Sequence, residues 1–358
     1  MTRRPPRPQR PHPMTHRPAL VALAVALAAA SGPAAAQDRV ATTAAPFLTL
    51  GTGARGQSLG HAYTAAATGA DALFWNPAGA ARRDAQVRGD VFLTQHEWIA
   101  DIRYNAAGVT LPVGRDGSVL GVSVASVGYG RDAVRTEREP EGTGDTFGAN
   151  DFSFGLSYAR PLTDAFYFGG TAKVVRQQIW DMSATGFAAD FGISLDTGFN
   201  GVQLAASIQN FGTKMRMGGI NAQRFVDVDE GTQGNNENVT AQLEMEGWDL
   251  PLSFRFGASA PLVRAGGAEL RILADAQQTN DNVLNADVGG LLSYDAGLVG
   301  LELRGGYRDA FVEDVDNHLS FGGGIRADVQ GYSIGVDVAY LPFDLLGSAT
   351  LFDLRLEF

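Results

Sequence analysis

The sequence predicts a closed transmembrane β-barrel of about fourteen antiparallel strands. After about residue 85, large apolar side chains alternate with small or polar ones in one segment after another. The segments are each about ten residues long, and the links between them alternate between short and long. These observations favour strands that cross a bilayer, because such strands present one face to hydrocarbon and the other to a polar interior.

The chain begins with the features of a secretory signal peptide. Residues 1–36 contain five arginines and no acidic residue, and they include the apolar run Ala19–Ala30, which is too short to span a bilayer as a helix. The small residues that precede Gln37 predict cleavage after Ala36. The stretch from Met14 onward is a complete signal by itself, so Met14 is an alternative start to the first methionine.

Charge and cysteine content narrow the class of protein. Loss of the five arginines changes the formal net charge from −11 to −16, which argues against nucleic acids and anionic membrane surfaces as partners. The chain has no cysteine, so the exported protein folds without disulfides or thiolate metal sites. No other apolar run reaches the length of a spanning helix, so a membrane-embedded form must be a closed barrel surrounded by outer-membrane lipid.

The alternation is clearest in residues 151–160. There, Phe152, Phe154, Leu156 and Tyr158 alternate with serine, glycine and alanine. The same pattern predicts strands near residues 86–96, 101–112, 118–129, 151–160, 165–177, 185–196, 201–210, 251–260, 268–278, 284–294, 299–308, 318–328, 331–340 and 348–358. The even number of strands and their length are typical of bacterial outer-membrane barrels.

Link length is an independent observation. From the second strand onward, every other link is short, whereas the alternate links include the polar stretches 130–150 and 211–250. Short turns at one rim and long loops at the other predict an outer-membrane barrel with both chain ends in the periplasm.

A soluble β-sandwich or propeller is the alternative that alternation alone leaves open. Charged residues favour the barrel because they fall on the polar phase of the strands: Arg255, Arg271, Asp275, Asp287, Glu302, Arg304, Arg326, Asp337 and Arg355.

Residues 37–85 lack strand periodicity, and they open with a glycine motif. Gly51–Gly56 has the spacing G-x-G-x-x-G, and Asp71 lies 20 residues after Gly51, as in a dinucleotide-binding fold. That fold also needs helices alternating with parallel strands, and none follow here. We therefore expect the glycines to permit tight packing of this segment inside the barrel.

Catalytic and metal-binding patterns are weak. His61, His96 and His318 lie far apart in the sequence, and Ser58 matches G-x-S-x-G without the α/β sheet which that motif requires. The acidic stretches 227–231 and 313–316 are candidate calcium loops, but neither has the EF-hand order, so solvated loops are expected. The sequence predicts no enzyme activity and no cofactor.

Two motifs at opposite ends of the chain resemble a known family. The stretch GTGARGQSLGHAYTAAATGADALFWNPAGAA is similar to the N-terminal region of PorV/PorQ-type outer-membrane proteins. More loosely, it resembles the Asn-Pro-Ala hatch of FadL-type channels for hydrophobic compounds. The end, YSIGVDVAYLPFDLLGSATLFDLRLEF, is similar to the PorV/PorQ closing hairpin. Ala80 departs from the leucine that the family has at this position.

The resemblance implies a fourteen-stranded FadL-like barrel. Residues 37–85 would be a hatch, or plug, in the lumen of a barrel formed by residues 86–358. The hatch motif consists of Phe74, Trp75, Asn76, Pro77, Ala78 and Gly79. At the C-terminus, a pattern read by the barrel-assembly machinery consists of Phe352, Leu354, Leu356 and Phe358.

Two functions remain open from the sequence. The resemblance implies a role in type IX protein secretion, in which the barrel binds the translocon and the C-terminal domains of cargo proteins. Residues 211–250, with Trp248, would then be the partner loop. The alternative is a FadL-like transport channel in which Phe74 and Trp75 line a site for a hydrophobic small molecule. The same two aromatic residues would otherwise only seal the hatch against the wall.

Overall fold

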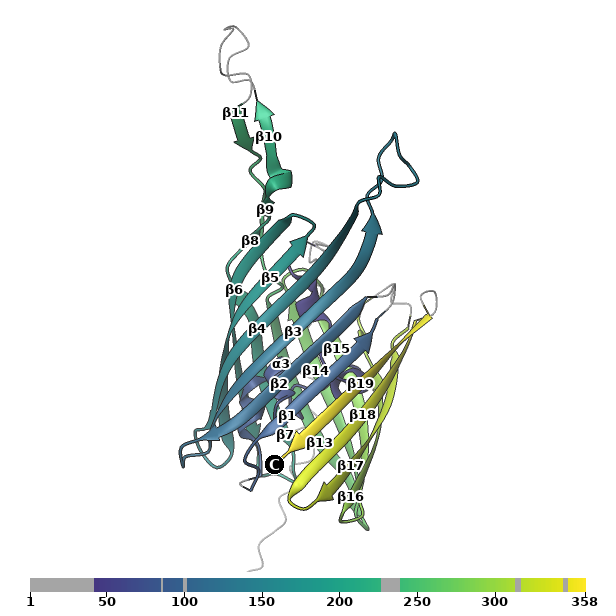
Figure 1. Ribbon diagram of the computed structural model, residues 1–358. Helices are drawn as coiled ribbons and strands as arrows, with labels where there is room; N and C mark the ends of the chain where they lie inside the picture. Colours follow the sequence, from purple (N-terminus) through teal and green to yellow (C-terminus); the bar gives the residue numbers. More distant parts are fainter. Residues whose placement is uncertain (1–41, 85, 99–101, 227–238, 313–316, 344–346) are drawn as a thin grey trace, which may run out of the picture. The chain divides into compact units, whose positions relative to one another are not determined.

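The computed structural model describes residues 42–84, 86–98, 102–226, 239–312, 317–343 and 347–358. The predicted signal peptide lies outside these residues. Fourteen antiparallel strands form a closed barrel, as the alternation predicts (Figure 1). They are β1 (Asp90–Glu97), β2 (Arg103–Val113), β3 (Ser118–Ala133), β4 (Thr146–Pro161), β5 (Phe166–Ile179), β6 (Met182–Asp196), β7 (Gln203–Gly212), β13 (Ser253–Ala265), β14 (Ala268–Thr279), β15 (Asn285–Asp295), β16 (Val299–Tyr307), β17 (Leu319–Val329), β18 (Tyr332–Phe343) and β19 (Gly347–Glu357). Each strand pairs with its neighbours along the chain, and β1 pairs with β19 to close the ring.

All fourteen predicted strands are present, and several are longer than predicted. The longest are β3 and β4, with 16 residues each, β6 with 15 and β5 with 14. The added residues of β3 and β4, 130–133 and 146–150, lie where glycines and charged residues interrupt the apolar alternation, so the sequence pattern fades while backbone pairing continues. Figure 1 shows β3 and β4 rising above the ends of β1 and β2.

The two rims of the barrel differ. The turn rim has the short links 114–117, 162–165, 197–202, 266–267, 296–298 and 330–331, close to the turns that the sequence predicts. β1 begins there and β19 ends there, and Phe358 N–H donates to Gly89 O at 3.0 Å. The opposite loop rim has the long links 134–145, 213–252 and 308–318, whereas its other links, 98–102, 180–181, 280–284 and 344–346, are as short as the turns. The predicted difference in link length therefore holds for three of the seven links of the loop rim.

The link between β7 and β13 forms a separate structure, the arm (residues 215–248). It contains β8 (Met215–Arg216), β9 (Gly218–Gly219), η4 (Ile220–Ala222), β10 (Gln223–Val226), β11 (Val239–Gln242) and β12 (Gly247–Trp248). β8 pairs with β12 and β9 pairs with the loop-rim end of β6, whereas β10 and β11 pair with each other. Figure 1 shows the β10–β11 hairpin extending from the loop rim.

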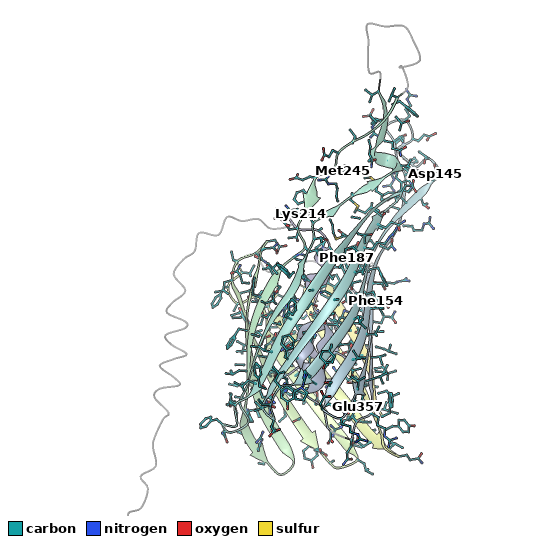
Figure 2. All side chains as sticks on the ribbon, turned by 90° about the vertical axis from the view of Figure 1, so that its left-hand side faces the viewer. Asp145, Phe154, Phe187, Lys214, Met245 and Glu357 are labelled. Atoms are coloured by element: carbon teal, nitrogen blue, oxygen red, sulfur yellow. The ribbon has the colours of Figure 1, made fainter. Side chains whose placement is uncertain are left out.

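The wall has an apolar outer face and a polar inner face. Leu156 is 54% exposed and Phe187 is 61% exposed, and both belong to the outward phase of their strands. Figure 2 labels Phe187 and Phe154 on the wall below the arm. In water so large an exposed apolar surface would drive association, whereas a bilayer would bury it. No helix within the described residues has the length and hydropathy to cross a membrane.

The N-terminal segment (residues 42–84) lies against the inner face of the wall. It contains η1 (Pro46–Thr49), α2 (Ala54–Ser58), α3 (Ala72–Trp75) and η2 (Pro77–Ala81). Proline begins both 3₁₀ helices, where its missing N–H costs nothing. Because these helices are no longer than five residues, they depend on contacts with the wall for their stability. The segment's α3 is visible behind the front strands in Figure 1.

Candidate functional site

The inner face near the loop rim carries an apolar chamber. Its wall is built largely from small side chains of β2, β3, β5 and β6, and the chamber is filled by two residues of the N-terminal segment. The chamber comprises Ala45, Phe47, Tyr104, Ala106, Ala125, Val127, Val175, Ala184, Ala188, Met215 and Leu250. Phe47 is 2% exposed, so its ring occupies space that small wall residues leave free. The chamber is thus a packed apolar cluster on a mostly polar inner face, filled by its own side chains.

A charged network lies deeper in the lumen, between the N-terminal segment and strands β16, β18 and β19. Asp337 on β18 is at its centre, with Arg55 Nε at 3.4 Å and Arg355 Nε at 3.3 Å. Arg304 forms ion pairs with Asp337 and Glu302. These groups are mostly buried, and buried charges are tolerated only when they are paired. The sequence placed the strand charges on the polar phase but did not identify Arg55 as their partner.

Asp71 and the last strand form a second contact between the segment and the wall. Asp71 Oδ2 pairs with Arg355 and accepts a hydrogen bond from Tyr63 Oη at 2.9 Å. Asp353, two residues before Arg355, accepts the Ala54 N–H at 2.6 Å. The acidic residue at the dinucleotide-fold spacing, Asp71, is thus a residue that binds an arginine of the wall.

Trp75 is buried within the N-terminal segment. It is 2% exposed, and its Nε1 donates to Thr52 O at 2.7 Å. Tyr63 packs edge-on against its ring, and the Arg255 guanidinium lies 5.1 Å from the ring centroid. A Cβ atom at Gly56 would collide with the same ring, which gives one glycine of the opening motif a packing role.

Phe74, the neighbour of Trp75, lies between three apolar clusters. It is half-buried, packs against the apolar chamber, the cluster that contains Trp75 and a third cluster around Leu73, and lies 5.9 Å from the ring of Phe92. The two aromatic side chains that the sequence placed together in one site point in different directions, because successive residues of a helix point about 100° apart. Only Phe74 borders the chamber.

Asn76 and Pro77 connect the two halves of the hatch motif. Asn76 Oδ1 accepts the Ala78 N–H at 3.2 Å and so caps η2, and its Nδ2 donates to Thr64 O at 3.2 Å and Ile193 O at 3.0 Å. Ala78 and Gly79 are buried. The asparagine therefore makes contacts both within the segment and to β6.

Comparisons with known proteins address the fold. The sequence matches no protein-family model, and no curated protein matches it. The structure is similar to the Pseudomonas putida toluene transporter TodX, with a TM-score of 0.54 and 10% identity, covering 86% of this chain and 96% of TodX. It is also similar to the Ralstonia pickettii toluene transporter TbuX, with a TM-score of 0.52 and 10% identity, covering 86% of this chain and 97% of TbuX. A Pseudomonas aeruginosa FadL homologue is similar with a TM-score of 0.50 and 12% identity, covering 86% of this chain and 98% of the homologue.

The barrel fold is FadL-like. At its loop rim, this FadL-like barrel has a groove of about 650 Å³ between the ends of β3–β6 and the arm. The rim groove is lined by large apolar side chains that include Phe147, Trp180, Met182, Met217 and Met245. Methionine side chains adapt to ligands of different shape. The sequence gave no sign of this groove, because its residues come from β4, β5 and β6, from the β3–β4 and β5–β6 links, and from the arm.

The other predicted site residues of the FadL-like barrel lie apart from the chamber. Phe352 and Leu354 are exposed on the outward face of β19, Leu356 is half-buried, and Phe358 ends the chain at the turn rim. Trp248, 45% exposed, pairs with Met215 at the base of the arm. Roles for these residues in barrel assembly and partner binding stay predictions.

The candidate catalytic residues have structural contacts. Ser58 Oγ donates to Arg55 O at 3.1 Å, within its own helix. His61 shares a hydrogen bond with Gln57 at 2.9 Å, and burial, reinforced by Arg255, lowers the pKa of His61 to about 3. Among the described residues, no group of three or more His, Asp or Glu side chains is placed to hold a metal ion. The acidic stretches 227–231 and 313–316 lie outside the described residues.

Proposed function

We propose that this protein is a non-enzymatic outer-membrane channel for hydrophobic small molecules. The observation that carries the proposal is the apolar chamber beneath the loop rim of a FadL-like barrel. Two structurally similar barrels, TodX and TbuX, are described as toluene transporters. Transfer of a phenyl-sized group from water into such a chamber is favourable by about 2 kcal/mol, which offsets the cost of moving the Phe47 ring out of it.

In this proposal the ligand enters from the loop rim. The rim groove offers apolar surface outside the bilayer, and the chamber follows inside the lumen. Because Phe47 fills the chamber, a ligand must displace its ring and take its place within the cluster. Phe74, at the border of the chamber, would then contact the ligand from below.

The proposed orientation places the turn rim in the periplasm. The mature N-terminal region and Phe358 would both be periplasmic, and the outward apolar faces would contact outer-membrane lipid. The predicted signal peptide supports export, and the short turns support this choice of rim.

Two adjacent alanines on β2 allow a matched test. Ala106 faces the chamber, whereas its neighbour Ala107 belongs to the outward phase. Ala106→Trp should fill the chamber and reduce uptake of radiolabelled toluene by at least tenfold in cells that depend on this barrel. Ala107→Trp should leave uptake unchanged. Equal uptake by both variants and the wild type would overturn the proposed route.

The arm favours a second candidate function, the binding of a partner protein. Phe225 is 75% exposed and Ile220 is 70% exposed, and Trp248 lies at the base of the same arm. A two-stranded hairpin with both faces in water is marginally stable, which favours a partner that covers it. Together with the two end motifs, this supports a PorV/PorQ-type role with type IX translocon proteins or cargo domains.

Affinity purification distinguishes the second function from the first. The full-length protein and a variant lacking residues 215–248 would be purified from detergent-solubilised membranes, and bound proteins identified by mass spectrometry. Recovery of type IX components by the full-length protein alone supports the secretion role. Identical sets of bound proteins would exclude the arm as their binding site.

A further inference from the structure

Lysine is rare in this chain, and one of its lysines lies inside the barrel. The sequence has 28 arginine and lysine residues in total, and only two of them, Lys173 and Lys214, are lysines. Lys214 is exposed near the base of the arm and pairs with Asp249 at 3.2 Å. The Lys173 side chain, on the inner face of β5, is 13% exposed. Elsewhere in the lumen, buried carboxylates pair with arginine, as Asp337 does.

Lys173 meets two other side chains, which come from the next two strands. Its Nζ lies 2.8 Å from Asp190 Oδ1 on β6 and donates a hydrogen bond to Asn210 Oδ1 on β7. Asp190 is 2% exposed and Asn210 is 3% exposed. An amine, a carboxyl group and a carboxamide are therefore in contact across three adjacent strands, and we call these three side chains the triad.

A β-bulge brings Asn210 into the triad. In an unbroken strand only every second residue faces inward, yet Gln209 and Asn210 are both buried. The pairing of β6 with β7 shifts register between Ala189 and Phe191, and Asn210 has a left-handed φ of 62°. Bulges are enriched beside functional sites, where they re-aim a side chain. Here the extra residue turns the carboxamide toward Lys173, in a backbone conformation that asparagine tolerates better than most residues.

Hydrogen bonds hold the carboxamide of the triad in one orientation. Asn210 Nδ2 donates to Pro251 O at 3.0 Å, so Oδ1 is the end that faces the amine. The Asn210 backbone N–H donates to Asp190 Oδ1 at 2.8 Å, so the carboxyl group contacts both of its partners. The inward neighbours Val175 and Ala188 belong to the apolar chamber, which keeps bulk water away from one side of the triad.

We propose that Lys173 and Asn210 become joined by an isopeptide bond, a covalent brace between β5 and β7. An amine and a carboxamide that are held in contact react much faster than the same groups in solution, because their orientation is already set. Lysine suits this step because it can lose its proton and act as a nucleophile, whereas arginine stays protonated. An arginine at position 173 would keep the ion pair with Asp190 but could not form the bond. The brace would fix β7, the strand that leads into the arm, whichever ligand or partner the barrel binds.

The atoms of the reaction balance without an added reagent. Asp190 takes a proton from the Lys173 ammonium group across 2.8 Å, and the neutral Nζ then forms a bond to Asn210 Cγ. Asp190 gives this proton to Nδ2 as the Cγ–Nδ2 bond breaks, and it takes the second proton that Nζ releases on becoming an amide. Ammonia leaves and carries the last proton away as ammonium, so Asp190 ends as it began. No atom is oxidised or reduced.

The mass of the wild-type protein tests the bond. The mature chain, isolated from outer membranes, should weigh less than its sequence by one ammonia molecule. Trypsin cuts after Arg176, between the two residues, so tandem mass spectrometry should recover the peptides with Lys173 and Asn210 as one joined species. Assignment to peptides is essential, because Gln37 follows the predicted cleavage site and an N-terminal glutamine also loses ammonia. Recovery of these two peptides only as separate species would overturn the proposal.

The second lysine provides the matched control. Lys214→Arg should keep the joined peptides, whereas Lys173→Arg should give separate peptides only, with the same amount of folded barrel measured by the gel shift on boiling. Asp190→Asn keeps the side-chain shape but cannot take the proton, so it should lower the joined fraction at least about tenfold. Joined peptides in Lys173→Arg would overturn the assignment of the bond, and an unchanged joined fraction in Asp190→Asn would overturn proton transfer by Asp190. The wild-type result decides whether the bond exists even if a variant fails to fold.

Discussion

Replacing Asp71 by asparagine should lower the free energy of unfolding by about 3 kcal/mol, the lower end of the range for breaking a buried ion pair. Asp71 is buried, and its Oδ2 accepts hydrogen bonds from both Arg355 and Tyr63. Asparagine keeps the shape of the side chain but removes its charge. We expect the lower end of that range because, in the variant, Arg355 still has Asp337 as an ion-pair partner, at 3.3 Å from its Nε.

An exposed ion pair provides the control. Asp295 and Arg326 lie 3.5 Å apart near the turn rim, where both side chains are exposed, so Asp295→Asn should cost less than about 1 kcal/mol. Unfolding in urea, followed in lipid vesicles by the fluorescence of the four tryptophans, measures both variants. Equal, small losses of stability for the two variants would refute the expectation that the Asp71 pair stabilises the fold.

Four further predictions concern the hatch motif and the barrel. Trp75→Ala should cost about 3–5 kcal/mol in the same urea assay, because it removes a buried aromatic side chain. Phe74→Ala should cost less than Trp75→Ala and mainly reduce toluene uptake, and a reversed order would contradict the separation of the two rings. Asn76→Ala should cost about 2 kcal/mol, since it removes a helix cap and two donated hydrogen bonds; Asn76→Asp should cost more, because its buried carboxylate would face the carbonyl oxygens of Thr64 and Ile193 without a donor. The unboiled wild type should migrate differently from the boiled protein on a gel, and identical mobility would contradict a closed barrel.

The strands were predictable because a bilayer-spanning wall imposes a period of two on its side chains. Phe152–Tyr158 shows this directly, since one face meets hydrocarbon and the other the lumen. The extensions of β3 to β6 were not predictable by this signal, because both faces of a strand outside the bilayer meet water. Residues 130–133 and 146–149 accordingly show little apolar alternation.

The candidate site was predictable only in part. The sequence singled out Phe74 to Gly79, but it did not show that Phe74 and Trp75 have different surroundings, which depends on a single helical turn. Arg55 and Asp71 pair with residues more than 240 positions away, and no local pattern signals such a partner.

The contacts between the beginning and the end of the chain also affect how the protein folds. Ala54 meets Asp353 across a separation of 299 residues, and Asp71 meets Arg355 across 284. Both partners lie on β19, the strand that joins β1 and completes the ring. Residues 54–71 therefore gain these contacts only after the last strand has been synthesised and exported. Since such distant pairings form slowly, the final step of maturation should be slow, and until it is complete the unpaired arginine and carboxylates leave the interior open to water and proteases.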